Sequence, residues 1–216
     1  MLPLLLGHRG ARATKSVSEN TIESFDLALQ HGCDGFEFDV RLTSDSFPVI
    51  CHDAQFCGSN IARANRSDLN LTLLEDVVAR YAQQAFLDIE LKVVGLEDAV
   101  LAALRRHVPE RFVVSSFLPQ ILSALRSRDS RLPLGFICDR ADHLRRWPEL
   151  PVQYVIPRHD LVHRNLIKEV HDSGKSVFVW TVNERDAMRR FADCGVDAII
   201  SDDTELLVGI LKGKLA

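Results

Sequence analysis

A short apolar run followed by a segment of helical pattern recurs about eight times along the chain. The apolar runs span residues 2–6, 35–40, 86–91, 112–115, 133–138, 152–156, 177–182 and 197–201. The helices expected after them span 19–31, 73–83, 96–107, 118–128, 140–146, 161–173, 184–194 and 203–212. Eight such units are what a closed (β/α)₈ TIM barrel requires. An open doubly wound sheet shows the same alternation, but we prefer the closed barrel.

The apolar run at residues 47–51 does not fit this alternation, because it follows the run at 35–40 after only a short turn. A parallel crossover needs about a dozen residues, so we expect 47–51 to fold back antiparallel as a hairpin arm. The arm would deliver His52 and Asp53 to one end of the barrel. The segment after it, up to residue 72, is short, which predicts a reduced insertion over the mouth.

Composition narrows the class of protein. The chain has 216 residues, 46% of them hydrophobic, and no linker or composition break divides it, so we expect a single domain over 1–216. A net charge of −4 argues against nucleic-acid binding. The five cysteines include no C-x-x-C pair, which favours reduced thiols and a cytoplasmic location. The apolar start is too short for a signal peptide, and we expect no stable membrane insertion.

Charged residues stand in two runs where a core strand should be apolar. Glu37 and Asp39 share one face of a strand, and Asp88, Glu90 and Lys92 share a face of the next. The carboxyl ends of barrel strands meet at one mouth, where converging carboxylates would repel unless a cation neutralises them. Oxygen ligands without clustered Cys or His favour Mg²⁺ or Ca²⁺ over Zn²⁺.

Six short motifs in one order resemble those of the glycerophosphodiester phosphodiesterase family. In chain order they are His8-Arg9-Gly10-Ala11, Ser18-Glu19-Asn20-Thr21, Glu37-Phe38-Asp39-Val40, Pro48-Val49-Ile50-Cys51-His52-Asp53, Glu90-Leu91-Lys92 and Trp180-Thr181-Val182-Asn183. The resemblance spans residue 7 to about residue 203. It implies a TIM barrel that hydrolyses small-molecule glycerophosphodiesters to sn-glycerol 3-phosphate and an alcohol.

The resemblance also implies a site made of three groups of residues. Three carboxylates would hold one divalent cation, Mg²⁺ or Ca²⁺: Glu37, Asp39 and Glu90. Two imidazoles would form the acid-base pair: His8 and His52. Two positively charged side chains, Arg9 and Lys92, would contact the phosphate. Two further side chains, Trp180 and Asn183, would lie near the alcohol.

The chemistry of phosphodiester cleavage requires groups of these kinds. Two imidazoles, with an ordinary pKa of about 6.5, can remove one proton and donate another near neutral pH. The residues leave open which histidine is the base. They also leave open whether a glycerol hydroxyl or a water attacks, and therefore whether a cyclic phosphate forms.

Some of these residues also have a purely structural interpretation. Glu19 is a substrate-site residue or an acid favoured by a helix dipole, and Asn20 or Ser18 would serve as a helix cap. Trp180 lies near the alcohol or fills the core. We also predict that Asp88 is a structural partner of Lys92.

Other functions remain open. A lysophospholipase D or a cyclising phospholipase would need an apolar entrance, whereas residues 54–71 contain few large apolar side chains. A non-catalytic phosphate-ligand-binding barrel would have lost a carboxylate or a histidine, and none is lost. A phosphosugar isomerase or aldolase barrel would have a Gly-rich phosphate loop after its last strands, where residues 195–203 end in acids. The preferred alcohol and the oligomeric state are not predicted.

Overall fold

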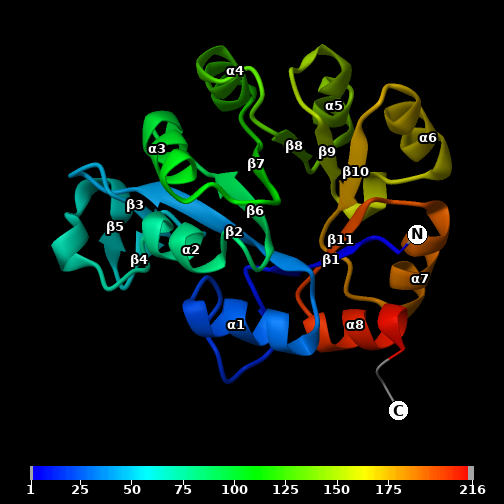
Figure 1. Cartoon of the computed structure of the whole chain (residues 1–216), viewed down its shortest axis with the longest axis horizontal. Helices are drawn as coiled ribbons and strands as arrows, with labels where there is room; N and C mark the ends of the chain where they lie inside the picture. Colours follow the sequence, from blue (N-terminus) through cyan, green and yellow to red (C-terminus); the bar gives the residue numbers. More distant parts are fainter. Residues whose placement is uncertain (1, 214–216) are drawn as a thin grey trace.

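Eight parallel strands close into a barrel in the computed structural model, which describes residues 2–213 (Figure 1). The strands are β1 (Leu4–His8), β2 (Gly35–Leu42), β6 (Phe86–Leu91), β7 (Phe112–Ser116), β8 (Leu134–Cys138), β9 (Tyr154–Pro157), β10 (Ser176–Val179) and β11 (Ala198–Ser201). β1 pairs in parallel with both β2 and β11, so the sheet closes on itself. The predicted TIM barrel is confirmed. The expected domain of 1–216 includes residues 1 and 214–216, which lie outside the described part.

The helices form a ring around the barrel (Figure 1). They are α1 (Ile22–His31), α2 (Leu74–Tyr81), α3 (Glu97–His107), α4 (Pro119–Arg128), α5 (Ala141–Leu144), α6 (Arg164–Asp172), α7 (Arg185–Cys194) and α8 (Thr204–Lys212). Their apolar faces pack on the outer side of the strands, and an aromatic cluster shows how closely. Phe25 of α1 stacks on Phe36 of β2 with ring centroids 4.2 Å apart, and Tyr81 of α2 meets both rings edge-on.

Two helices begin three residues later than the sequence pattern predicts, and a side chain caps each of them. α1 begins at Ile22, since the Thr21 hydroxyl accepts a hydrogen bond from the Ser24 amide. Residues 18–20 therefore lie in a turn before the helix. α6 begins at Arg164 after the cap His163, and a short 3₁₀ turn, η4 (His159–Leu161), precedes it.

The hairpin arm is present as predicted. β3 (Pro48–Ile50) pairs antiparallel with β2, with Val40 opposite Ile50. The segment after it is short: a two-stranded hairpin of β4 (Gln55–Phe56) and β5 (Ser59–Asn60), then two 3₁₀ turns, η1 (Ile61–Arg63) and η2 (Arg66–Asp68). One more 3₁₀ turn, η3 (Trp147–Glu149), follows α5. The arm and the small hairpin lie at one side of the barrel, beside α2 (Figure 1).

A second apolar cluster fills the inside of the barrel below its mouth. It contains Leu6, Phe86, Val113, Ile137, Ile156, Phe178, Ala198 and Ile200. These side chains come from successive strands and form a packed floor, as in TIM barrels generally. The floor leaves the polar groups at the carboxyl ends of the strands facing the mouth. Among residues 2–213, no helix is long and apolar enough to cross a membrane.

Candidate active site

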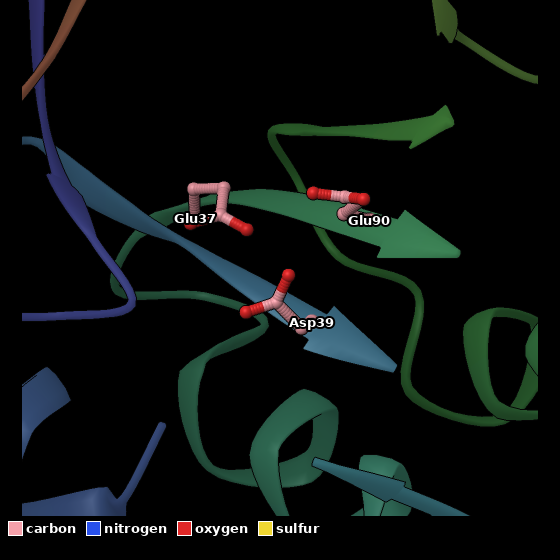
Figure 2. Close-up of side chains that lie close together, drawn as sticks. All are labelled: Glu37, Asp39 and Glu90. Carbon is pink, nitrogen blue, oxygen red and sulfur yellow. The ribbon is translucent and has the colours of Figure 1, made fainter. Parts of the chain in front are cut away.

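Three carboxylates from two neighbouring strands meet in the mouth of the barrel (Figure 2). The register of β2 and β6 places Asp39 opposite Glu90, and the two-residue period turns Glu37 to the same side as Asp39. One ligand atom of each carboxylate lies within 4.8 Å of the others. All three residues are buried, with 4%, 1% and 7% of the surfaces of Glu37, Asp39 and Glu90 exposed. The structure therefore brings together the carboxylates that the sequence singled out.

Their charges are not balanced by the surrounding side chains. Burial, then the charges of Asp39 and Glu90, raises the pKa of Glu37 well above its usual range. Burial and the charge of Asp39 likewise raise the pKa of Glu90 to about 7. Burial also acts to raise the pKa of Asp39, but the nearby Lys92 and Arg9 charges outweigh it and lower that pKa. The three carboxylates therefore retain negative charge that a bound cation could neutralise.

The oxygen atoms of these three carboxylates are suitable ligands for a hard cation. Glu37 Oε1 and Asp39 Oδ1 are buried and accept no hydrogen bond from the described residues. Lys92 Nζ lies 2.7 Å from Glu90 Oε1 and 3.2 Å from Asp39 Oδ1, which neutralises part of the charge. Buried carboxylate oxygens that accept no hydrogen bond, grouped without a sulfur or imidazole ligand, suit Mg²⁺ or Ca²⁺.

His8 ends β1 and is held by an aspartate from the opposite end of the sequence. Its Nδ1 lies 2.6 Å from Asp202 Oδ1, and its Nε2 lies 3.8 Å from Glu37 Oε2. Asp202 also accepts from Asn183 Nδ2 at 2.7 Å and from Arg12 Nη1 at 3.1 Å. Burial would raise the pKa of Asp202, but the hydrogen bond and charge of His8 hold it well below its usual range.

Asp202 is a site residue that the sequence reasoning missed. The signal was present, since the last apolar run ends directly in Ser201, Asp202 and Asp203. An acid at the carboxyl end of a barrel strand is a candidate for the site by position alone. In the sequence alone, these acids serve only as evidence against a phosphate loop.

His52 reaches the same pocket from the hairpin arm. Its Nδ1 lies 2.7 Å from Asp53 Oδ1, which leaves the other ring nitrogen for the pocket. The ring is half-buried, and burial lowers its pKa. Both imidazoles of the predicted pair therefore have one nitrogen held by a carboxylate.

Arg9 and Asn20 attach the first loop to the carboxylates. The Arg9 amide donates to Glu37 Oε2 at 3.0 Å, and Arg9 Nη1 donates to Glu19 Oε1 at 2.8 Å. Asn20 Nδ2 donates to Asp39 Oδ2 at 2.8 Å, while its Oδ1 accepts from the Asp39 amide at 3.2 Å. The backbones of Arg9 and Asn20 are left-handed, with φ of 53° and 58°. Such backbone strain in non-glycine residues gathers at functional sites.

These contacts bear on the interpretations of Glu19 and Asn20. Glu19 lies outside α1 and binds the guanidinium groups of Arg9 and Arg12, so its contacts are to the site loop. Asn20 is not the helix cap, which is Thr21, but orients the carboxylate of Asp39. That second role has no local sequence signal, because it depends on the approach of the loop to β2.

Glu37, Glu90 and both imidazoles line a pocket of about 80 Å³, here called the inner pocket. Its polar wall contains His8, Arg9, Glu37, His52, Asp88, Glu90 and Lys92. Its apolar wall contains Phe117, Ile137, Ile156, Trp180 and Ile200. Trp180 donates from Nε1 to the Ile156 carbonyl at 2.9 Å and meets Phe117 edge-on. Asn183 is not part of this lining, and its amide is bound to Asp202.

The prediction for Asp88 was wrong. Asp88 accepts a hydrogen bond from the Ser115 hydroxyl of β7, whereas Lys92 binds Glu90 and Asp39. Four residues of strand separate Asp88 from Lys92 by about 13 Å, so a side chain on the adjacent strand is the nearer partner. Burial, together with the charge of Asp39, raises the pKa of Asp88 to about 7 although Ser115 acts to lower it.

The fold and this pocket together define a TIM-barrel enzyme whose mouth combines an acidic centre, two oriented imidazoles and two cations. The family comparison narrows the class further. Residues 8–85 and 77–206 match the model of the glycerophosphoryl diester phosphodiesterase family. The chain belongs to this family, and it is a phosphodiesterase.

Individual relatives are similar to this chain over nearly its whole length. A glycerophosphodiester phosphodiesterase of Caldanaerobacter subterraneus subsp. tengcongensis is 26% identical over 98% of this chain and 99% of its own. The crystal structure of such an enzyme from Thermotoga maritima superposes with a TM-score of 0.83 at 25% identity, covering 97% of this chain and 99% of that one. An Oleispira antarctica phosphodiesterase, solved with the product sn-glycerol-3-phosphate, shares the fold with a TM-score of 0.86 at 22% identity, over 98% and 97% of the two chains.

Proposed function

We propose that this phosphodiesterase hydrolyses glycerophosphodiesters to sn-glycerol 3-phosphate and an alcohol, with His8 and His52 as the acid-base pair. The single observation that carries the proposal is the geometry of the inner pocket. It places both imidazoles beside three buried carboxylates and two cationic side chains. The relatives named above and the product bound to the Oleispira enzyme support the same substrate class. We infer as well that residues 1–216 act as one domain.

The cationic side chains would bind the phosphate. Arg9 offers a planar guanidinium and Lys92 a point charge, and both line the inner pocket. Glu37, Asp39 and Glu90 would hold one divalent cation, Mg²⁺ or Ca²⁺. That ion would neutralise phosphate charge and favour deprotonation of the attacking hydroxyl.

The two histidines would move the protons. One imidazole would take the proton of the attacking glycerol hydroxyl or water as its oxygen bonds to phosphorus. The other would protonate the departing alkoxide as its bond to phosphorus breaks. Asp202 and Asp53 each hold the Nδ1 of one ring, so Nε2 would be the atom that exchanges the proton. Attack by the glycerol hydroxyl would give a cyclic phosphate first and glycerol phosphate after its hydrolysis.

The apolar wall of the inner pocket would pack against carbon atoms of the substrate. Trp180 and Phe117 form one continuous aromatic face there. Asn183 would act only through Asp202, because its amide does not line the pocket.

A substrate panel tests the proposal. Glycerophosphocholine, glycerophosphoethanolamine, glycerophosphoglycerol and a lysophospholipid are each incubated with the protein in Mg²⁺ or Ca²⁺, and the products are separated and identified. Release of sn-glycerol 3-phosphate from at least one glycerophosphodiester is expected. Turnover of the lysophospholipid alone, or a cyclic phosphate as the end product, would favour the lysophospholipase D or cyclising alternative. No turnover of any of the four would contradict a phosphodiesterase of this specificity.

A further inference from the structure

The inner pocket is too small for both halves of a phosphodiester. Its volume is about 80 Å³, and its walls already supply the phosphate and cation contacts. A larger hollow of about 430 Å³, here called the outer hollow, lies between residues 18–21, 50–56 and 70–72. Its size falls in the range of ordinary small-molecule sites.

The two cavities meet at one side chain. His52 lines both the inner pocket and the outer hollow. The wall of the outer hollow also includes Asn20, which orients Asp39. A diester whose phosphate lies in the inner pocket could therefore extend past the His52 ring into the outer hollow, with the bond to be cleaved beside that ring.

Uncommitted hydrogen-bonding side chains line the outer hollow. In the part of the chain that the structure describes, none of the side chains of Ser18, Gln55, Asn70 and Thr72 takes part in a hydrogen bond. Phe56 packs against the small apolar cluster below the arm and gives the hollow an apolar surface. Amides and hydroxyls around an aromatic ring suit a polyhydroxylated ligand, whose hydroxyls both donate and accept.

The carboxylates of the outer hollow are already paired. Glu19 binds Arg9 and Arg12, and Asp53 binds His52. Two guanidinium groups therefore neutralise Glu19, and the Asp53 side chain is largely exposed, so an ion pair between it and an ammonium group would contribute little. The charges of the hollow therefore do not favour a cationic alcohol such as choline or ethanolamine over a neutral one.

We propose that the outer hollow is the subsite for the leaving alcohol, and that it selects a neutral polyol such as glycerol. This inference rests on the proposed function, since it assigns the second half of the same substrate. Asn70 and Thr72 would bind hydroxyls of that alcohol and so determine specificity.

The test compares two substrates that differ only in the alcohol. Values of kcat/KM are measured for glycerophosphoglycerol and glycerophosphocholine, in saturating Mg²⁺ or Ca²⁺, with the natural protein and with the variants Asn70→Ala and Thr72→Val. The matched control is Asn165→Ala, an exposed asparagine on α6 away from both cavities. Thermal unfolding of each variant shows whether it is folded.

The natural protein is expected to prefer glycerophosphoglycerol by about fivefold or more, the ratio that one hydrogen bond provides. Asn70→Ala and Thr72→Val should each reduce this preference, mainly through KM, and Asn165→Ala should retain it. A preference for glycerophosphocholine, or one unchanged in both folded variants, would overturn the subsite and leave the proposed function intact. No hydrolysis of either substrate would overturn both.

Discussion

Asp202 Oδ1 lies 2.6 Å from His8 Nδ1, although 194 residues separate them in the chain. The contact fixes the ring so that Nε2 faces Glu37 and the inner pocket. Asn183 holds Asp202 in turn, accepting from its amide and donating to its carboxylate. Asp202 thus orients His8, and Asn183 orients Asp202. These two residues follow β11 and β10 at the mouth of the barrel.

Replacing Asp202 by asparagine should lower kcat by about tenfold or more. The change removes the negative charge beside the His8 ring, and it turns one of the two oxygens that face His8 and Asn183 into an NH₂ donor, which disturbs the orientation and tautomer of the ring. KM should change less than kcat, since Asp202 does not line the inner pocket. Asp203→Asn is the matched control, because Asp203 caps α8 and an asparagine can still do so. Equal kcat values for Asp202→Asn and the natural protein would remove Asp202 from the account.

The same aspartate should contribute to stability in a pH-dependent way. Its folded pKa lies well below the usual range, so its contribution is present above pH of about 4, the pKa expected in the unfolded chain. The contribution is lost as pH falls through the range between the unfolded and folded pKa. Urea unfolding at pH 6 and pH 3.5 should therefore show a smaller stability difference between the natural protein and Asp202→Asn at the lower pH. If this stability difference instead grew on acidification, the result would contradict a lowered pKa of Asp202 in the folded protein.

The carboxylate group should be a source of instability in the metal-free protein. Because the pKa of Glu37 is raised well above its value in the unfolded chain, this carboxyl group costs folding free energy at neutral pH. Glu37→Gln removes that cost, so it should raise the melting temperature in chelator by about 2–4 °C, the shift of roughly 1 kcal/mol for a chain of this size. The same variant should lose most of the stabilisation that Mg²⁺ or Ca²⁺ gives the natural protein. Glu169→Gln, an exposed change on α6, is the control and should change neither. A lower melting temperature of Glu37→Gln in chelator would argue against charge repulsion.

Each proposed catalytic histidine should be indispensable. His8→Ala and His52→Ala should each reduce turnover by about 100-fold or more, the usual contribution of a general acid or base. His171→Ala is a suitable control, because His171 forms an exposed pair with Asp197 far from the inner pocket. Circular dichroism confirms that the variants are folded. Near-natural turnover by either site variant would exclude that residue from proton transfer.

The barrel itself depends on a close contact between its strands. A Cβ added to Gly35 would overlap the Phe86 carbonyl oxygen, a backbone atom that cannot move aside. Gly35→Ala should therefore cost about 3 kcal/mol or more, measured by urea unfolding, or prevent folding. At Gly135 the nearest obstacle is the end of the Ile156 side chain, so Gly135→Ala should cost less. Equal losses would contradict the register of β2 and β6.

The sequence predicts most of the barrel, because most strands are short apolar runs and most helices follow them with an amphipathic period. The carboxylates of the site can also be predicted from local patterns. Glu37 and Asp39 share one face of a strand, and the neighbouring strand carries acids with the same two-residue spacing. The pair of His8 and Asp202 is different. It exists only because barrel closure places Gly7 opposite Ser201, a register that no local pattern encodes.

The same limit explains the wrong partner for Asp88. Face periodicity relates residues along one strand, whereas the hydrogen bond with Ser115 crosses between two strands. The turn that places Asn20 against Asp39 depends on a left-handed backbone at a non-glycine residue, which propensity does not predict.

The most direct test of the account is the ion dependence of sn-glycerol 3-phosphate release from glycerophosphoglycerol, followed by phosphorus NMR. The protein is stripped with chelator, assayed, and assayed again after Mg²⁺ or Ca²⁺ is restored. We expect a product signal that disappears in chelator and returns with at least one of the two ions. Undiminished hydrolysis by the fully stripped protein would contradict a catalytic role for a cation held by Glu37, Asp39 and Glu90.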